Sequence, residues 1–251
     1  IVPLEGLGLA EDHLDLLKLM IARPHGIILV TGPTGSGKTT TLYSAINHIK
    51  SEGVNIMTLE DPVEYPMALV RQTSVAESAK LDFANGIRSM MRQDPDVILV
   101  GEIRDTDTAE MAFRAAMTGH QVYSTLHTNS AIGAIPRLLD IGILPDLMAG
   151  NIIGIVAQRL VRRLCPGCKT PYQAEAHESR LLGIPAEGPR PVIYHPCGCE
   201  RCDFQGYRGR IAIMELLRMT PAMDELVARR ATAREIRNEA TRQGFRPLAD
   251  D

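Results

Sequence analysis

The chain has 251 residues, of which 45% are hydrophobic and 23% charged, and its formal net charge at pH 7 is −3. A chain of this length can bury one substantial core and a smaller second unit. Its acidic balance argues against a nucleic-acid partner, because nucleic-acid-binding proteins usually carry a clustered basic excess. No stretch reaches the roughly 18 apolar residues that span a bilayer, and the first residues lack the order of a signal peptide. We therefore expect a cytoplasmic protein.

The first half of the chain alternates short apolar runs with longer amphipathic stretches. Runs typical of strands that are covered on both faces lie at 26–31, 55–59 and 96–100, and a fourth predicted strand, with weaker alternation, lies at 121–126. Stretches with helical apolar spacing lie between them, at 38–50, 81–93 and 106–118. Thr106 or Asp107 is expected to cap the last of these helices. The alternation predicts an α/β fold with a mostly parallel sheet.

The second half is punctuated by glycine and proline and contains all the cysteines. In its tail, Thr220 followed by Pro221 suits the start of a helix, and Thr232 with Glu235 forms a capping-box pattern. We interpret the chain as a piece of a longer protein, because it does not begin with Met and ends directly after a predicted helix. The expected parts are a core with its following helices, a cysteine-bearing subdomain and a truncated helical segment, at 1–160, 161–210 and 211–251.

A glycine-rich loop follows the first predicted strand and opens the next helix. Residues 32–39 fit the pattern G-x-x-x-x-G-K-[ST] in the strand–loop–helix context that a phosphate-binding loop requires. Lys38 can reach the β- and γ-phosphate oxygens, and the Thr39 hydroxyl can ligate Mg²⁺. A glycine-rich turn without a ligand is the alternative. The expected nucleotide-binding residues are Gly32, Pro33, Thr34, Gly35, Ser36, Gly37, Lys38, Thr39 and Thr40.

Acidic residues follow two of the predicted strands, where ATP hydrolysis needs a carboxylate to hold Mg²⁺ or to orient water. Glu60, Asp61 and Glu64 follow the second strand, and Glu102 with Asp105 follows the third. An exposed loop acid or a helix cap is the alternative for each cluster. Beside a phosphate-binding loop, the functional interpretation is preferred.

Two histidines flank the fourth predicted strand. His120 and His127 would each, taken alone, more often be ordinary packed or surface histidines. Their odd spacing places them on opposite faces of a strand, so we do not expect them to share a ligand. His127, beside the carboxyl end of the strand, is the better candidate for sensing a γ-phosphate.

This succession of motifs resembles the ATPase family that powers type II secretion and type IV pilus assembly. The matching segments are a Walker A loop, an Asp box, a Walker B segment and a His box, at 32–39, 58–65, 98–105 and 118–129. The resemblance implies a RecA-like P-loop NTPase core that hydrolyses ATP with Mg²⁺. It also implies that Glu102 activates the attacking water.

The same resemblance assigns the Asp-box acids to arranging Mg²⁺ and water. Gly101 stands just after the third strand, where a Mg²⁺-holding Asp is common, which leaves the division of labour between Glu60 and Glu102 open. The expected catalytic residues are Glu102, Glu60, Lys38 and His127. The expected magnesium ligands are Thr39, Glu64 and Asp61.

Four cysteines form two C-x-x-C pairs, Cys165 with Cys168 and Cys199 with Cys202. This arrangement can present four thiolates tetrahedrally to Zn²⁺, in a structural site because no coordination position stays open. Free thiols and disulfides are the alternatives, and reducing conditions disfavour disulfides. We interpret Cys197 as a bystander, although it could substitute for Cys199.

The cysteine insert bears on function within the resembled family. Secretion and pilus-assembly ATPases resemble this chain in carrying it, whereas pilus-retraction ATPases lack it, so assembly or secretion is preferred. The resemblance implies a homo-hexamer of the full-length protein, which inner-membrane platform proteins would bring to the membrane surface. A nucleotide-gated scaffold and a nucleic-acid translocase on the same core are the alternatives. The arginine-rich run at 159–163 is interpreted as a solvated helix face, and a surface that faces acidic lipid or a membrane partner is the alternative.

Overall fold

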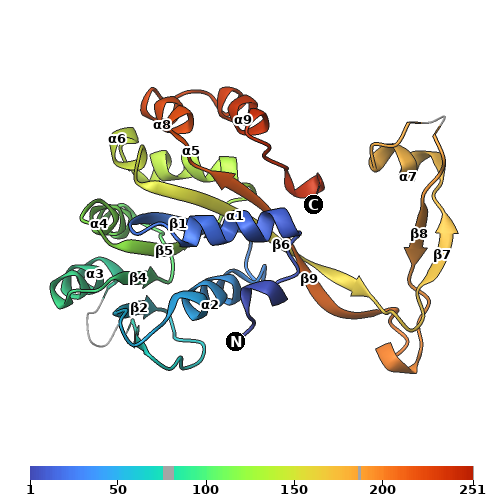
Figure 1. The fold of residues 1–251 in the computed structure, drawn as a ribbon, viewed down its shortest axis with the longest axis horizontal. Helices are drawn as coiled ribbons and strands as arrows, with labels where there is room; N and C mark the ends of the chain where they lie inside the picture. Colours follow the sequence, from blue (N-terminus) through green and yellow to red (C-terminus); the bar gives the residue numbers. More distant parts are fainter. Residues whose placement is uncertain (76–81, 186–187, 251) are drawn as a thin grey trace. The chain divides into compact units, whose positions relative to one another are not determined.

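The structure, a computed structural model, describes residues 1–75, 82–185 and 188–250. The chain forms two compact units: unit 1 comprises Ile1–Arg159 with Ala212–Asp251, and unit 2 comprises Leu160–Ile211. The chain leaves unit 1 along strand β6 (Ile152–Leu164) and returns along strand β9 (Tyr207–Arg218), as Figure 1 shows.

Unit 1 is built on a seven-stranded sheet with the strand order β3-β2-β4-β5-β1-β6-β9. The pairings from β3 through β6 are all parallel. The bounds of its first five strands are β1 (Gly26–Thr31), β2 (Ile56–Glu60), β3 (Val70–Ser74), β4 (Val97–Val100) and β5 (Gln121–Leu126). Every residue of β1, β2, β4 and β5 is buried, as the near-continuous apolar runs predict. Because the strands are parallel, their carboxyl ends share one edge of the sheet.

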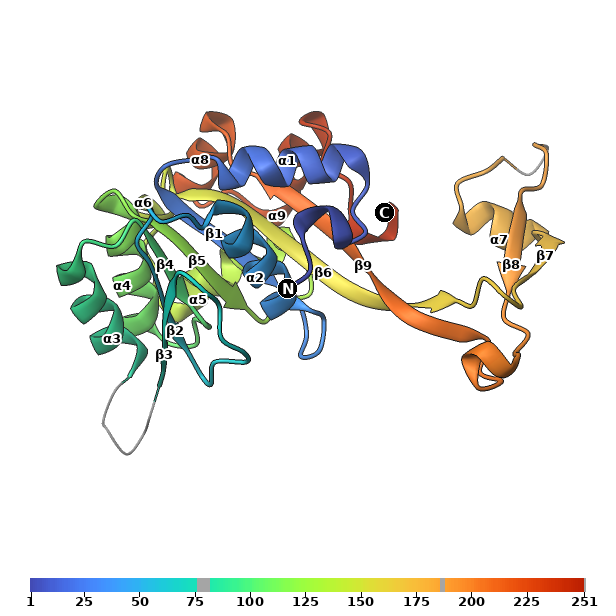
Figure 2. The same ribbon diagram turned by 60° about the horizontal axis from the view of Figure 1, so that its bottom comes forward.

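Helices pack on the sheet of unit 1. Helix α2 packs on β1 and β5, while α3 packs on β2 and β4 and lies beside α4 (Figure 2). Contacts also join α5 to α9, α6 to α8 and α8 to α9. The helices are α1 (Glu11–Ile21), α2 (Lys38–Ile49), α3 (Phe83–Met90), α4 (Thr106–Met117), α5 (Ala131–Ile141), α6 (Pro145–Met148), α8 (Pro221–Ala228) and α9 (Ala233–Arg242). Single 3-10 turns lie at η1 (Leu4–Gly6), η3 (Met91–Gln93) and η5 (Leu248–Asp250).

Most predicted elements of the first half are confirmed to within one or two residues. The strands at 26–31 and 121–126 have the expected bounds, and β2 and β4 each begin one residue later than expected. The predicted start of α3, Leu81, lies outside the described residues. One cap was predicted wrongly: Asp105 caps α4, because its carboxylate accepts the N–H of Thr108 at 2.8 Å, and Thr106 is already helical.

Both caps predicted for the C-terminal helices are confirmed. The Thr220 hydroxyl accepts the N–H of Met223 at the start of α8. At the start of α9, the Thr232 hydroxyl accepts the N–H of Glu235, and the Glu235 carboxylate accepts the N–H of Thr232. Each hydrogen bond satisfies an amide that the helix itself leaves without a partner.

Three strands of the seven-stranded sheet were not predicted: β3, β6 and β9. The arginine-rich run at 159–163 belongs to β6, so its interpretation as a helix face was wrong. Residues 211–218, expected in a helical segment, lie in β9. β6 is buried from Ile152 through Gln158 and is partly or fully exposed from Arg159 onward, so its burial changes where it passes from unit 1 to unit 2.

Unit 2 has very little apolar core. Its two-stranded antiparallel sheet pairs β7 (Thr170–Gln173) with β8 (Val192–His195), and it contains α7 (Ala176–Leu181) and a 3-10 turn, η4 (Glu200–Cys202). Of its described residues, the buried hydrophobic ones are Cys165, Ala174 and Cys202, whereas Leu181 is 84% exposed. A unit of this size with so small a core needs a cross-link or a metal to be stable.

Tyr123 provides a test of packing in unit 1. Its side chain on β5 is fully buried, and its hydroxyl has no hydrogen-bond partner within the described part of the chain. Because a buried hydroxyl without a partner is destabilising, we expect Tyr123→Phe to stabilise unit 1 by about 1 kcal/mol. Thermal unfolding would then shift upward by about 2–4 °C.

The matched control for this variant is Tyr43→Phe. Tyr43 is also buried, but its hydroxyl donates to the Glu60 carboxylate. Removing this donor should lower the unfolding temperature. An equal loss of stability in the two variants would show that the Tyr123 hydroxyl has a stabilising partner after all.

Candidate active site and metal centre

The glycine-rich loop joins the end of β1 to the start of α2. Gly32, Gly35 and Gly37 have φ angles of +150°, +77° and +88°. A Cβ atom on Gly32 would lie 2.5 Å from the carbonyl oxygen of Gln158 and 2.6 Å from the Ser36 hydroxyl. Only glycine fits at this position, so the sequence pattern reflects a backbone that must pass close to its neighbours.

Lys38, the first residue of α2, lies over the loop. Its ammonium donates to the carbonyl oxygens of Gly32 at 2.8 Å and Pro33 at 3.1 Å. Burial lowers the pKa of Lys38 from its ordinary value, and the nearby negative charge of Glu102 partly opposes this. Thr39 and Thr40 follow in the first turn and are exposed. The amino end of α2 therefore offers the backbone N–H groups and the cation that bind anionic phosphates.

Gln158 supports the loop from β6, and the sequence patterns did not identify it. The side chain is 1% exposed, donates to the Ser36 carbonyl oxygen at 2.5 Å and accepts from the Thr41 hydroxyl at 2.7 Å. It thus fixes the end of the loop against the first turns of α2. The available signal was a polar residue directly after the apolar run of β6, but a lone polar residue in a strand does not show which face it points to or what it contacts.

Glu102 lies beside two of the other predicted catalytic residues, His127 and Lys38. It follows β4, and its side chain is 13% exposed. One carboxylate oxygen lies 3.4 Å from Nε2 of His127 and the other 2.6 Å from Nη2 of Arg104. The parallel strands β4 and β5 bring Glu102 and His127 together, since each residue follows the carboxyl end of its strand. Glu102, His127 and Lys38 therefore form one group of ionisable side chains.

Glu60 is in a different environment. It is the last residue of β2 rather than the first loop residue, and it is 4% exposed. Tyr43 donates to one of its oxygens and Thr58 to the other, the latter at 2.5 Å, while Gln72 Nε2 lies 3.5 Å from the same oxygen as Thr58. Burial, together with the hydrogen bond to Glu60, raises the pKa of Tyr43 well above its ordinary value. Both Glu60 oxygens are thus already hydrogen-bonded within the protein.

Asp61, Glu64 and His120 have no contact with this group among the described residues. Asp61 and Glu64 are exposed in the loop after β2. Asp61 lines a cavity of about 860 Å³ with Arg104 and Asp105, and no residue of the glycine-rich loop lines it. Nδ1 of His120 is within hydrogen-bond distance of the Ala115 carbonyl oxygen and the Thr118 hydroxyl, at the opposite end of β5 from His127.

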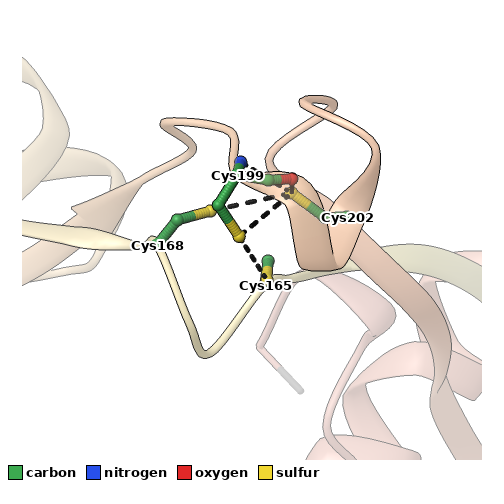
Figure 3. Close-up of side chains that lie close together, drawn as sticks. All are labelled: Cys165, Cys168, Cys199 and Cys202. Atoms are coloured by element: carbon green, nitrogen blue, oxygen red, sulfur yellow. Dashed lines mark hydrogen bonds between the residues drawn. The ribbon is translucent and has the colours of Figure 1, made fainter.

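The four paired cysteines of unit 2 meet at one point (Figure 3). All four sulfur atoms lie within 4.8 Å of one another. The Cys165–Cys199, Cys168–Cys202 and Cys199–Cys202 sulfur pairs are separated by 3.9, 3.8 and 3.8 Å. A tetrahedral zinc with Zn–S bonds of about 2.3 Å places its sulfurs about 3.8 Å apart, whereas a disulfide needs about 2.05 Å. The donor set and its spacing fit a tetrathiolate metal site.

Backbone N–H groups surround these sulfur atoms. Cys168 Sγ accepts from Gly198 at 3.3 Å, and Cys202 Sγ accepts from Cys199 and Gly206, each at 3.2 Å. Although burial opposes the shift, the two N–H donors lower the pKa of the Cys202 thiol to about 7. Such donors favour the thiolate form, which is the form that binds metal.

The fifth cysteine lies outside this cluster. Cys197 is exposed, and its sulfur lies 2.9 Å from the hydroxyl oxygen of Thr170. It is not among the residues whose sulfur atoms converge.

In the described part of the chain, no helix has the length and apolar character required to cross a bilayer.

The chain is similar to proteins of bacterial secretion and pilus assembly systems. The chain is 54% identical over 214 residues to type II secretion system protein E of Dickeya dadantii, which covers 85% of the chain and 42% of that protein. It is 46% identical over 245 residues to the type IV pilus assembly ATPase TfpB of Acinetobacter baylyi, covering 97% of the chain and 42% of that protein. The chain thus spans less than half the length of these relatives.

A solved structure supports the fold as well. The crystal structure of the pilus retraction motor PilT with bound ADP aligns over 100% of the chain and 66% of its own, with a TM-score of 0.64 and 33% identity. The expected fold class, a P-loop NTPase core with a tetracysteine insert and C-terminal helices, is confirmed. The whole chain, residues 1–251, matches the family described as Type II/IV secretion system protein. The chain therefore belongs to the type II/IV secretion system protein family.

Proposed function

We propose that this chain is the ATPase motor domain of a type II secretion or type IV pilus assembly machine. The observation that carries the proposal is the grouping of Lys38, Glu102 and His127 beside a glycine-rich loop at the amino end of α2. A cation for the phosphates and an acid for water are the two groups that ATP hydrolysis requires of the protein. The relatives include a type II secretion system protein and a type IV pilus assembly ATPase, and this supports the assignment of the chain to such a machine.

Within this proposal, the loop and the first turn of α2 bind the nucleotide. Backbone N–H groups of the loop and of the first turn of α2 surround the phosphates, and Lys38 leaves its carbonyl partners to contact the β- and γ-phosphate oxygens. Thr39 would hold Mg²⁺, with Asp61 and Glu64 as further oxygen ligands from the loop after β2. The ion would supply positive charge that offsets the charge on the transferred phosphate.

The two acids have different roles in this proposal. Glu102 activates the attacking water, because it is partly exposed and lies beside Lys38 and His127. His127 senses the γ-phosphate through its contact with Glu102. Glu60 contributes through the arrangement of β2 and α2, because its oxygens are already bonded to Tyr43 and Thr58.

Unit 2 is proposed to hold one structural Zn²⁺ between Cys165, Cys168, Cys199 and Cys202. The support is the fit of the sulfur spacing to a tetrathiolate site and the near absence of an apolar core among the described residues of that unit. Four thiolates leave no position for a substrate, so the metal stabilises the fold. The insert also favours assembly or secretion over retraction.

The full-length protein is proposed to form a homo-hexamer in the cytoplasm. It is expected to reach the inner membrane through platform proteins of the secretion or pilus machine, and no nucleic acid is expected as a partner. Several subunits around a ring would let the energy of hydrolysis drive movement of one domain against another. Family membership supports this proposal.

The test is phosphate release from ATP by the full-length protein. Release at saturating ATP that depends on Mg²⁺ is the expected result. Nucleotide binding without release, in the presence of the complete chain, would contradict the motor function and favour a nucleotide-gated scaffold. Stimulation by DNA that is lost at high salt would instead favour a nucleic-acid translocase.

A further inference from the structure

Glu215 is a buried acid that none of the family motifs includes. It lies on β9 and is 3% exposed. One carboxylate oxygen accepts the N–H of Ala131 at 2.6 Å, and the other accepts the N–H of Leu248 at 2.9 Å. The carboxylate therefore connects the sheet edge to the start of α5 and to the last turn of the described chain.

The chemistry of these contacts requires a carboxylate. Both neighbours are backbone N–H donors, so the side chain between them must offer two acceptors and no donor. Ala131 is the first residue of α5, where amides have no partner within the helix and where a negative charge is favourable. An amide side chain of the same shape would satisfy one N–H and place its own NH₂ group against the other.

The start of α5 is continuous with the loop that carries His127. The Thr128 hydroxyl donates to the Ser130 carbonyl oxygen at 2.9 Å, and Thr31 accepts the N–H of Thr128 at 2.8 Å. Thr31 immediately precedes the glycine-rich loop. The His127 loop is thus fixed at one end by Thr31 and at the other by Glu215 through α5.

We propose that Glu215 is a positioning residue for ATP hydrolysis: it fixes the start of α5 and so holds His127 against Glu102. The inference rests on the proposed hydrolytic function. The Glu215 carboxylate is buried, and its two oxygens accept from amides at the first residues of two other elements, α5 and η5. Its role is to keep the loop in the one position where His127 contacts the catalytic acid.

The test compares steady-state kinetics of the full-length wild-type protein and Glu215→Gln. We expect kcat to fall about tenfold to hundredfold, because displacement of a catalytic loop by about 1 Å can have that effect. KM for ATP should stay within about twofold, because the phosphates are bound by the glycine-rich loop. Counting active sites by binding of an ATP analogue corrects for any unfolded protein. Glu225→Gln, at an exposed position of α8, is the matched control and should not change kcat.

A second variant removes the other half of the same hydrogen bond. Ala131→Pro lacks the N–H donor, and the first position of a helix tolerates proline. Ser130 has φ −148° and ψ 160°, which suits a residue before proline. Ala131→Pro should lower kcat as Glu215→Gln does. The double variant should be no slower than the slower single one, because both changes remove the same interaction.

Hydrogen exchange of the backbone from 127 to 133 provides a readout that does not need hydrolysis. Exchange there should become faster in Glu215→Gln. Three results would each overturn the proposal. The first is unchanged hydrogen exchange at 127–133 in Glu215→Gln, and the second is a double variant whose loss of kcat is the sum of the two single losses. The third is a Glu215→Gln protein that unfolds at a lower temperature but keeps the wild-type kcat per active site. Absence of hydrolysis in the wild-type protein would overturn the proposed function instead, and the exchange measurement would then decide the role of Glu215 alone.

Discussion

Replacing Glu102 with Gln is expected to lower kcat for ATP hydrolysis by at least about 100-fold while leaving the affinity for ATP within about threefold. The amide keeps the size of the side chain but can no longer take a proton from water. Nucleotide binding is preserved because the loop from Gly32 to Lys38 provides it through backbone N–H groups. Phosphate release and binding of a fluorescent ATP analogue by the full-length protein measure the two quantities separately.

Glu60→Gln is the comparison that decides between the two acids. Its side chain is buried between Tyr43 and Thr58, so the amide keeps an acceptor for one hydroxyl and places its NH₂ group against the other. We expect lower stability and a smaller loss of kcat than in Glu102→Gln. If Glu60→Gln abolished hydrolysis in folded protein and Glu102→Gln retained most of it, Glu60 rather than Glu102 would be the acid that activates water.

The parts of the site that could be predicted from sequence are those with local causes. Gly32, Gly35 and Gly37 are required by positive φ angles and close contacts within a few residues, so a short pattern identifies the loop. The spacing of Cys165 and Cys168 likewise fits one turn that presents two sulfurs to one point. The buried strands could also be predicted from short stretches of sequence, because near-continuous apolar runs are a local signal of burial on both faces.

What could not be predicted depends on partners far apart in the chain. Gln158 contacts Ser36 across 122 positions, and Glu215 contacts Ala131 across 84. A single polar residue in or beside a strand does not indicate whether it faces solvent or a buried amide. The strand β9 was missed for a related reason: its first half is exposed and its second half buried, so no single period runs through it.

The position of Glu60 shows how a small error in an element changes a functional interpretation. The sequence placed it in the loop after β2, where a carboxylate would be open to Mg²⁺ or water. The structure extends β2 by one residue, which places Glu60 within the buried layer beside Tyr43. At the end of a buried strand, its carboxylate is covered by neighbouring side chains instead of open to solvent. The hydrogen bonds of Glu60, rather than its motif, therefore determine the role assigned to it.

Cys202→Ser is expected to abolish stoichiometric zinc binding and to unfold unit 2, while unit 1 keeps its fold and its affinity for ATP. Cys202 is buried and receives two N–H groups, so a serine there leaves a poor ligand in a site shaped for a thiolate. Structural zinc supplies about 10–16 kcal/mol of apparent binding free energy. That is several times the roughly 3–5 kcal/mol that a single small core supplies, and the core of unit 2 is smaller still.

The measurements are zinc content per chain and limited proteolysis across the insert, with a chelator as an independent way to remove the metal. Cys197→Ser is the matched control, because its sulfur lies outside the cluster, and it should retain zinc and protease resistance. Loss of zinc from Cys197→Ser would make Cys197 a ligand in place of Cys199. A protease-resistant insert in metal-free Cys202→Ser would mean that packing alone holds unit 2. The scarcity of buried apolar side chains among the described residues there argues that the metal, rather than packing, determines the fold of the insert.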